Sequence, residues 1–305
     1  MGHDLEGKLV VGVSTRALFD LDEAHRVFEQ EGVDAYIRYQ IENERVPLRP
    51  GTGFPLVRGL LRINDLLGDP VVEVVIISRN SAETGLRTAH SIRALGLPIT
   101  RAAFTRGRPA YQYLSAFSCD LFLSAHEEDV VEALKAGFAA GRILPVPPSP
   151  DAADGEVRIA FDGDAVLFSP ASQEIYDSHG LEAFQAHERS RADEPMEAGP
   201  FMGFLRALCA IQARFSAEAC PLRTALITAR DAVSHQRVVR TLRAMNVRID
   251  EAFFLGGVPK ERFVAAWKAH IFFDDQLVHA EPASKVSPTA QVPRPETPGA
   301  RPAAR

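Results

Sequence analysis

Two aspartates separated by one residue are the first feature of this sequence that could carry out chemistry. Asp162 and Asp164 flank Gly163 directly after the apolar run VRIAF at 157–161. Such a run predicts a buried strand, and the ligands of open α/β sheets bind beyond the carboxyl ends of the strands. One carboxylate could act there as a nucleophile while the other moves a proton. The alternative is an ordinary turn, because Asp and Gly are common turn formers.

A second acidic pair follows another apolar run. Asp274 and Asp275 come directly after HIFF at 270–273. Adjacent carboxylates repel each other unless they are solvated or share a cation. Mg²⁺ suits such a pair, because it binds a few carboxylates and keeps waters and substrate phosphate oxygens as its other ligands. The pair therefore predicts either a magnesium site or a solvated loop.

A hydroxyl and a lysine stand where they could hold a phosphate. Thr228 ends the apolar run TALIT at 224–228. Its hydroxyl, with the backbone N–H groups of Ala229 and Arg230, could bind a phosphate oxygen. Lys260 stands at the expected start of a helix, where a cation opposes the helix dipole unless an anion lies nearby. The alternatives are a helix N-cap for Thr228 and a solvated surface position for Lys260.

Short apolar runs bounded by polar residues supply the strands that would position these groups. Helical patterns lie between the runs, as in HQRVVRTLRAMN at 235–246. Alternating strands and helices predict an α/β fold with mainly parallel sheets. The expected strands are LVVGV (9–13), VVEVVIIS (71–78), CDLFLSA (119–125), VRIAF (157–161), TALIT (224–228) and HIFF (270–273).

The two halves of the sequence resemble each other. Residues 74–125 align without a gap on 224–275, an offset of 150, and share 12 identities in 52 positions. An offset of 148 places VFEQEGVDAY (27–36) on IYDSHGLEAF (175–184). We interpret this as an internal duplication, which predicts two tandem related domains.

Composition suggests where these domains begin and end. The first is expected at 8–146 and the second at 157–281. The segment PVPPSPDAADGE at 145–156, where the two meet, is expected to be a linker. Residues 282–305 are rich in proline and alanine and are expected to be a disordered tail.

Charge and composition exclude several classes of function. The net charge is −6 and the pI about 5.9, whereas proteins that bind nucleic acid polymers usually carry a basic excess. No apolar run approaches the length of a membrane span, and the N-terminal residues lack the features of a signal peptide. The three cysteines are too few and too scattered for a disulfide framework or a zinc site. The sequence therefore predicts a cytoplasmic protein.

The order of the candidate residues resembles a known superfamily. An Asp-x-Asp after one strand, a Thr after the next, a Lys and then an acidic pair are the motifs of the haloacid-dehalogenase-like phosphohydrolases. The strings FDGDAVLFS, LITAR, IDEAFFLGG and IFFDDQ resemble the cytosolic 5′-nucleotidase type I family more closely. So do VSTRALFD, SRNSAETGLR, TRAAFTRG and DLFLSAHEEDV in the first half. The resemblance covers about 9–280 and implies a Rossmann-like fold with a small helical cap at about 169–223 in the second domain.

The resemblance also implies a reaction and the residues that perform it. It implies that Asp162 attacks the phosphate of an AMP-like nucleoside 5′-monophosphate, and that Asp164 is the acid and base. Thr228 and Lys260 would stabilise the phosphate oxygens, with Gly163, Ala229 and Arg230 as further phosphate-binding residues. Mg²⁺ would be held by Asp162, the backbone carbonyl of Asp164 and the pair Asp274 and Asp275, of which either could be the direct ligand.

The duplication predicts that only the second half is catalytic. Asp162 aligns with Ser14, Asp164 with Arg16, Thr228 with Ser78 and Lys260 with Ala110. Asp274 and Asp275 align with Ser124 and Ala125. The first half lacks the nucleophile, the acid, the lysine and both acidic metal ligands, so we expect it to be catalytically degenerate.

Recognition of the base and sugar is less well defined. Phe184 could stack on a base and His187 lies nearby in the expected cap, although core packing and a surface position are the alternatives. Arg79 and Asn80 could contribute from the first half or be ordinary loop residues. Two other functions stay open: a phosphatase of sugar phosphates or other small phosphomonoesters, and a non-enzymatic nucleotide-binding or scaffold protein. Homo-oligomerisation is also open.

Overall fold

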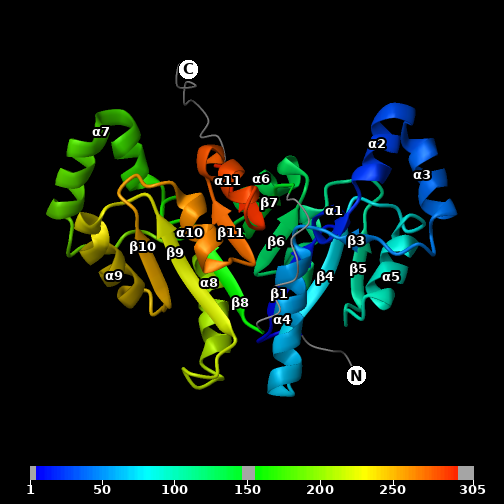
Figure 1. Cartoon of the computed structure of the whole chain (residues 1–305), viewed down its shortest axis with the longest axis horizontal. Coiled ribbons are helices and arrows are strands. Elements are labelled where there is room, and N and C mark those ends of the chain that lie inside the picture. The colour runs from blue at the N-terminus through cyan, green and yellow to red at the C-terminus, as the bar shows by residue number, and fades with distance from the viewer. Residues whose placement is uncertain (1–4, 146–154, 295–305) are drawn as a thin grey trace.

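A ten-stranded sheet runs through the whole molecule, in a computed structural model that describes residues 5–145 and 155–294 (Figure 1). The strand order is β10-β9-β8-β11-β12-β7-β6-β1-β4-β5. The strands are β1 (Leu9–Val13), β4 (Val72–Ser78), β5 (Arg101–Phe104), β6 (Leu121–Ser124), β7 (Ala139–Ile143), β8 (Val157–Phe161), β9 (Leu222–Thr228), β10 (Glu251–Phe254), β11 (Ile271–Asp274) and β12 (Thr289–Gln291). A small separate sheet pairs β2 (Phe19–Asp20) with β3 (Arg49–Pro50).

The two halves of this sheet have the same strand order. β7-β6-β1-β4-β5 in the first half corresponds to β12-β11-β8-β9-β10 in the second. Neighbouring strands are parallel within each half, and the halves meet where β12 pairs with β7 in antiparallel fashion. The mainly parallel α/β sheet predicted from the sequence is therefore confirmed.

Helices alternate with the strands and cover both faces of the sheet (Figure 1). In this view α2–α3 and α7 stand up at opposite ends of the molecule, and α4 and α8 extend to the bottom of the view. No helix within residues 5–145 and 155–294 is both long enough and apolar enough to cross a membrane. The helices are α1 (Thr15–Leu18), α2 (Asp22–Glu31), α3 (Val33–Glu42), α4 (Phe54–Leu67), α5 (Gly85–Ala94), α6 (Glu127–Lys135), α7 (Ala171–Ser190), α8 (Met202–Gln212), α9 (His235–Ala244), α10 (Lys260–Trp267) and α11 (Leu277–Ser284).

Alternate residues of each strand enter different parts of the core, because successive side chains of a strand point to opposite faces. Val11 belongs to the core cluster that also contains Leu60 of α4 and Leu205 of α8, so this cluster spans both halves. Val10 belongs to a smaller cluster with Val130 of α6. Burial on both faces explains why the strands are continuous apolar runs in the sequence.

Left-handed backbone positions recur between the halves. Gly32, between α2 and α3, has φ 85° and ψ −176°, and Gly180 inside α7 has φ 79° and ψ −176°. These glycines are 148 residues apart, so the kinked α7 is the counterpart of the α2–α3 pair. Ser118 and Lys268, 150 residues apart, have φ 51° and 55°. The related sequences therefore adopt the same local backbone.

The predicted disordered tail is wrong for residues 282–294. Helix α11 continues to Ser284 with Pro282 inside it, and β12 at Thr289–Gln291 pairs with both β11 and β7 near the middle of the sheet. Strand β12 could not be recognised from the sequence pattern, because it has only three residues and prolines flank it. Residues 295–305 of the predicted tail, and 146–154 of the predicted linker, lie outside the described residues.

The predicted cap at about 169–223 contains two different kinds of helix. Helix α8 buries Phe204, Leu205 and Leu208 in the core shared with the strands, so this part of the range is not a cap. Its apolar side chains recur at helical spacing because one face must cover the sheet. Helix α7 stands away from the sheet at one end of the molecule (Figure 1). It is the part of the range that fits a small helical cap.

Candidate active site

Three of the predicted aspartates meet at the carboxyl ends of two neighbouring strands. Asp162 directly follows β8, whereas Asp274 ends β11 and Asp275 follows it. Phe161 pairs with Phe273 in the parallel register of these strands, so both strands end at the same level. One carboxylate oxygen from each of the three aspartates lies within 4.8 Å of the other two. All three residues are buried, which rules out a solvated loop for the acidic pair.

Lys260 lies inside this cluster and not on the surface. It is the first residue of α10 and is 1% exposed. Its Nζ atom is 2.8 Å from Oδ1 of Asp162 and donates a hydrogen bond of 2.7 Å to Oδ2 of Asp274. Burial lowers the pKa of Lys260, but the two carboxylates outweigh this effect and raise it above its ordinary value. The lysine therefore carries a positive charge in the site.

The acidic cluster has the donor set and the electrostatics of a cation site. Burial, followed by the charge of Asp162, raises the pKa of Asp275 to about 7. Burial also raises the pKa of Asp162 to about 7, although Lys260 opposes that shift. The buried Oδ1 atom of Asp275 has no hydrogen-bond partner within the described residues. A divalent cation would take up this oxygen and relieve the repulsion between the carboxylates, so these residues fit a metal.

A residue of the predicted tail completes the cluster. Arg294 donates a hydrogen bond of 2.6 Å from Nε to Oδ2 of Asp275. Sequence reasoning missed this contact because the surrounding residues lack the apolar pattern of an ordered element. Arg294 also fixes the orientation of Asp275, because one carboxylate oxygen is bound and the other is left for a ligand.

Thr228 and Gly163 lie against each other beside the cluster. Thr228 ends β9, the other neighbour of β8, and is 1% exposed. A Cβ atom added to Gly163 would lie 3.3 Å from Oγ1 of Thr228, so the glycine permits the close approach of the two strand ends. The same hydroxyl accepts a hydrogen bond of 3.3 Å from the backbone N–H of Arg230. Ala229, between them in sequence, is exposed.

Arg230 is engaged with carboxylates of the protein. Its Nε and Nη2 atoms donate hydrogen bonds of 2.8 and 2.7 Å to the two oxygens of Asp164. Its Nη1 atom donates one of 2.5 Å to Glu188 at the end of α7. Phe184, also on α7, is buried, and the guanidinium carbon lies 5.2 Å from the centre of its ring. The guanidinium therefore faces Asp164 and α7, and its predicted contact with phosphate stays a prediction.

Glu188 is a buried carboxylate that the sequence analysis did not select. Besides Arg230, it accepts hydrogen bonds of 2.7 Å from Arg237 and 2.9 Å from Ser172. The similarity of the two halves could have pointed to this residue, because its partner Arg237 aligns with the identical Arg87. Arg87 contacts Gln40, which aligns with Glu188, at 3.0 Å. His187, the neighbour of Glu188, is half-buried on α7.

The two predicted substrate residues of the first half lie in a cavity of their own. Arg79 donates a hydrogen bond of 2.8 Å to Asp129, and the side-chain oxygen of Asn80 accepts one of 3.3 Å from Tyr36. Both line a cavity of about 650 Å³ whose lining residues all come from the first half. A contribution of Arg79 and Asn80 to the acidic site of the second half stays a prediction.

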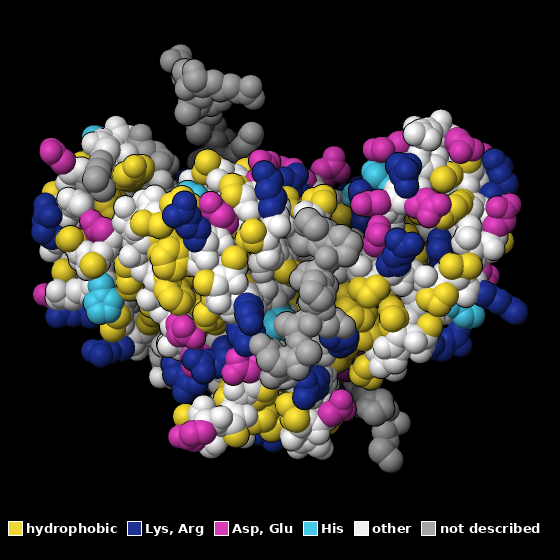
Figure 2. Space-filling model, in the orientation of Figure 1, with side chains coloured by type: hydrophobic (Ala, Val, Ile, Leu, Met, Phe, Trp, Pro, Cys, Tyr) yellow, Lys and Arg dark blue, Asp and Glu magenta, His cyan; other side chains and the backbone are white. Residues whose placement is uncertain are grey.

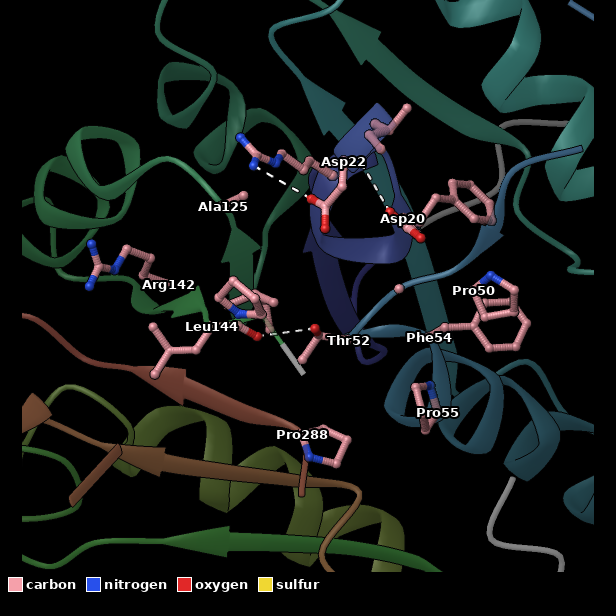
Figure 3. A pocket seen from close by; sticks show the side chains of 16 residues that line it. Asp20, Asp22, Pro50, Thr52, Phe54, Pro55, Ala125, Arg142, Leu144 and Pro288 are labelled. Carbon is pink, nitrogen blue, oxygen red and sulfur yellow. Dashed lines mark hydrogen bonds and ion pairs between the residues drawn. The ribbon is translucent and has the colours of Figure 1, made fainter. Parts of the chain in front are cut away.

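A further cavity of about 460 Å³ lies where the loops of the first half meet the start of β12 (Figure 3). Asp20 and Asp22 lie on one side of it, Arg142 on the other and Pro288 at its lower rim in this view. Thr52 donates a hydrogen bond of 3.1 Å to the carbonyl of Leu144 across its floor. None of the site residues predicted from the sequence lines this cavity, so the acidic cluster remains the candidate active site.

Comparison with known proteins identifies the family. A family model described as 5′-nucleotidase matches residues 1–298. The human protein named Cytosolic 5′-nucleotidase 1B is 36% identical over 293 residues, which cover 92% of this chain and 48% of that protein. The chain thus spans about half the length of this relative. The buried aspartates and Lys260 also occur in the order that the sequence resemblance required. The chain belongs to the 5′-nucleotidase family.

Proposed function

We propose that this chain hydrolyses nucleoside 5′-monophosphates, with AMP-like substrates favoured, to a nucleoside and phosphate. The observation that carries the proposal is the buried cluster of Asp162, Asp274 and Asp275 around the charged amine of Lys260. A phosphate group needs a nucleophile, cationic partners for its oxygens and a proton donor for its leaving group, and this cluster supplies the first two. Membership of the 5′-nucleotidase family supports the choice of substrate.

In this proposal Asp162 is the nucleophile. One of its carboxylate oxygens attacks phosphorus in line, and the bond between phosphorus and the 5′-oxygen breaks to leave an aspartyl-phosphate. Lys260, held 2.8 Å from Asp162, stabilises the negative charge on the transferring phosphoryl group. The hydroxyl of Thr228 donates a hydrogen bond to a second phosphoryl oxygen.

Asp164 moves the protons. With one oxygen released from Arg230 and protonated, it gives that proton to the departing 5′-oxygen. As a carboxylate it then takes a proton from the water that attacks the aspartyl-phosphate and regenerates Asp162. Arg230 is a positioning residue here, because its paired hydrogen bonds fix the plane of the Asp164 carboxylate. Glu188 anchors Arg230 to α7, so the orientation of Asp164 depends on the cap.

A divalent metal, which we propose to be Mg²⁺, fits the acidic cluster. Asp162, Asp275 and Asp274, with the backbone carbonyl of Asp164, would hold it, and Asp275 offers a buried oxygen without a partner. The bound ion would neutralise charge on the phosphate and orient it. Chelation with EDTA is expected to abolish turnover, and added Mg²⁺ is expected to restore it and to raise the melting temperature. The Asp275→Asn variant should show a much smaller rise.

We also propose that the second half alone performs this chemistry in a cytoplasmic enzyme. The positions of Asp162, Lys260 and Asp274 carry Ser14, Ala110 and Ser124 in the first half. The name of the human relative includes the word cytosolic, which supports the location.

The experiment that tests the proposal is phosphate release from AMP, IMP, GMP, CMP, UMP and their deoxy forms at fixed Mg²⁺. A panel of sugar phosphates and other small phosphomonoesters is measured beside them. We expect the nucleotides to be hydrolysed fastest and the folded Asp162→Asn variant to lose more than 95% of the turnover, or roughly a factor of twenty and above. Faster turnover of sugar phosphates would show that these, and not nucleotides, are the substrate class. Binding without turnover of any ester would favour a nucleotide-binding protein.

A further inference from the structure

The first half has an open cavity beside two strand ends that correspond to those of Asp162 and Thr228. It has a volume of about 650 Å³, within the range of small-molecule sites. Ser14 and Ser78 line it, and these residues align with Asp162 and Thr228. The hydroxyl of Ser78 accepts a hydrogen bond of 3.0 Å from Thr15, which again joins the ends of two neighbouring strands. The ends of β1 and β4 therefore border a cavity, although the counterparts of Lys260, Asp274 and Asp275 do not line it.

This cavity lacks the carboxylates that define the acidic site. The carboxylates that make a metal site in the second half are replaced by serine or alanine at Ser14, Ser124 and Ala125. Without these groups, the first-half cavity has neither a nucleophilic carboxylate nor a set of metal ligands at the strand ends. A ligand held there would not be hydrolysed by the mechanism proposed above.

The charges beside the strand ends are also reversed. In the second half Asp164 and Glu188 surround Arg230, which gives this triad a net negative charge. The aligned residues of the first half are Arg16, Gln40 and Asn80, which give a net positive charge. The whole lining contains three arginines and two aspartates. The arginines are Arg16, Arg79 and Arg106, and the aspartates are Asp34 and Asp129. The cavity therefore favours an anion without the help of a metal.

Three hydrogen-bond donors of this cavity are available to such an anion. Arg16 is about one third exposed, and its ion pair with Asp22 is long, at 3.7 Å; Asp22 is labelled in Figure 3. Arg106 is exposed and forms no ion pair within the described residues. The side-chain nitrogen of Asn80 is buried and lacks a hydrogen-bond partner among those residues. An unsatisfied buried donor costs stability, which a ligand oxygen would restore.

Beside these donors the cavity has an apolar wall from α2 and α3. Phe28 is 46% exposed, and its ring packs edge-on against Tyr36 with their centres 6.1 Å apart. Val33 is exposed as well and lines the same cavity. Large apolar side chains that stay exposed beside convergent polar groups are typical of a site that binds an amphipathic ligand.

We propose that the first half binds a phosphate monoester with an aromatic body in this cavity, without a metal and without hydrolysing it. The phosphate would lie against Arg16, Arg106 and Asn80, and the aromatic body against Phe28 and Tyr36. This site is distinct from the catalytic one and does not depend on the proposed nucleotidase activity.

Calorimetric titration of the full chain with phenyl phosphate in EDTA tests the proposal. Chelation keeps the acidic site free of metal and stops turnover. We expect one binding site, about tenfold weaker binding in Arg16→Gln and in Arg106→Gln, and weaker binding in Phe28→Ala. Inorganic phosphate should bind more weakly than phenyl phosphate, because it lacks the aromatic body, and phenol should not bind detectably.

Arg26→Gln is the matched control, because Arg26 is exposed on α2 but does not line the cavity. This variant should bind phenyl phosphate like the wild type, and all variants should melt at similar temperatures. The proposal is wrong if the chelated protein binds no phenyl phosphate. It is equally wrong if Arg16→Gln and Arg106→Gln bind as tightly as Arg26→Gln, because the anion would then lie elsewhere.

Discussion

Arg230 and Asp164 form the pair on which the proposed proton transfers depend. Both side chains are almost fully buried, and the two hydrogen bonds between them are shorter than 3 Å. The planar guanidinium fits a carboxylate in this paired manner, whereas an ammonium group cannot. If the role of Arg230 is to orient Asp164, its loss should affect the chemical step more than substrate binding.

The Arg230→Lys variant separates a positioning role from the phosphate-binding role predicted from the sequence. We expect kcat to fall by about 10²-fold with little change in KM, because catalysis depends on the geometry of the acid. Steady-state kinetics with AMP measure both constants. A large rise in KM at nearly constant kcat would instead identify Arg230 as a phosphate ligand.

Glu188 should matter for stability as well as for geometry. It is 1% exposed and accepts hydrogen bonds from Arg230, Arg237 and Ser172. The Glu188→Gln variant leaves two buried guanidinium groups without their shared carboxylate, so we expect it to lower the free energy of unfolding by about 3 kcal/mol. Urea unfolding measures this difference. Glu182→Gln, at an exposed position of the same helix, should change it by less than about 0.5 kcal/mol.

Reasoning from the sequence selected the residues at strand ends but not their partners. Asp162 and Asp274 could be predicted because each follows an apolar run, and parallel strands bring such positions together. Arg294 could not, because it reaches Asp275 from a separate segment whose packing no local pattern specifies. For Glu188 there was one indication, the alignment of its partner Arg237 with Arg87, but no pattern placed Glu188 beside Arg230.

At the scale of elements, the junction of β7 and β12 is packed more tightly than its composition suggests. A Cβ atom added to Gly141 of β7 would lie 2.9 Å from Cβ of Ala290 and 3.1 Å from the ring of Phe273. The absence of a side chain at this glycine therefore lets the inner strands of the two halves approach each other.

The Gly141→Ala variant is expected to lower the free energy of unfolding by about 1–3 kcal/mol, because neighbouring backbone and ring atoms must shift. Denaturant unfolding with Gly203→Ala as the matched control measures the effect. Gly203 lies on an exposed face of α8 with open space around it, and its replacement should stabilise the protein by about 0.5–1 kcal/mol. Equal effects of the two substitutions would contradict the close contact.

The elements themselves were predictable where the sequence pattern was long. The runs at 9–13 and 157–161 became β1 and β8 with the same bounds. Strand β12 was missed because three residues between prolines give no periodicity, and its pairing with β7 depends on contacts 147 residues apart, from Ile143 to Ala290. Helix α8 was assigned to a cap because an amphipathic pattern shows that one face of a helix is buried. The pattern does not show which element covers that face.

At the scale of the molecule, the two sequence halves share one core. The main cluster contains Val11 and Leu60 from the first half and Phe161 and Leu205 from the second. Val157 of β8 also packs against Gly59 of α4, where an added Cβ would lie 2.7 Å from a methyl group of Val157. Each half would expose part of this shared apolar surface if it were alone.

Separate expression of residues 1–146 and 157–305 tests this expectation. We expect each fragment to be largely insoluble or unfolded, and coexpression to recover a complex with the circular dichroism spectrum and melting behaviour of the intact chain. The shared core supplies the physical reason, because exposed apolar surface promotes aggregation. Two fragments that fold independently with sharp melting transitions would show that each half is a domain with a core of its own.

The sequence predicts that the chain does not bind nucleic acid polymers, and a binding measurement tests this prediction. On the face shown in Figure 2, acidic and basic side chains are mixed, including those over α2–α3 at the upper right. Binding to a duplex uses a stripe of lysine and arginine that follows the phosphates. A filter-binding measurement with random duplex DNA at physiological salt should therefore show no retention.

The antiparallel pairing of β12 with β7 affects the tendency of the protein to aggregate. Each half alone would present an inner strand with unpaired backbone groups, the kind of edge onto which further chains can add. Because the two halves pair through β12 and β7, the edge strands of the main sheet are β10 and β5. Each is four residues long, and they begin with Glu251 and Arg101. Short edges that begin with charged residues discourage the end-to-end growth of sheets into fibres. The pairing of β12 with β7 thus covers an inner strand of each half.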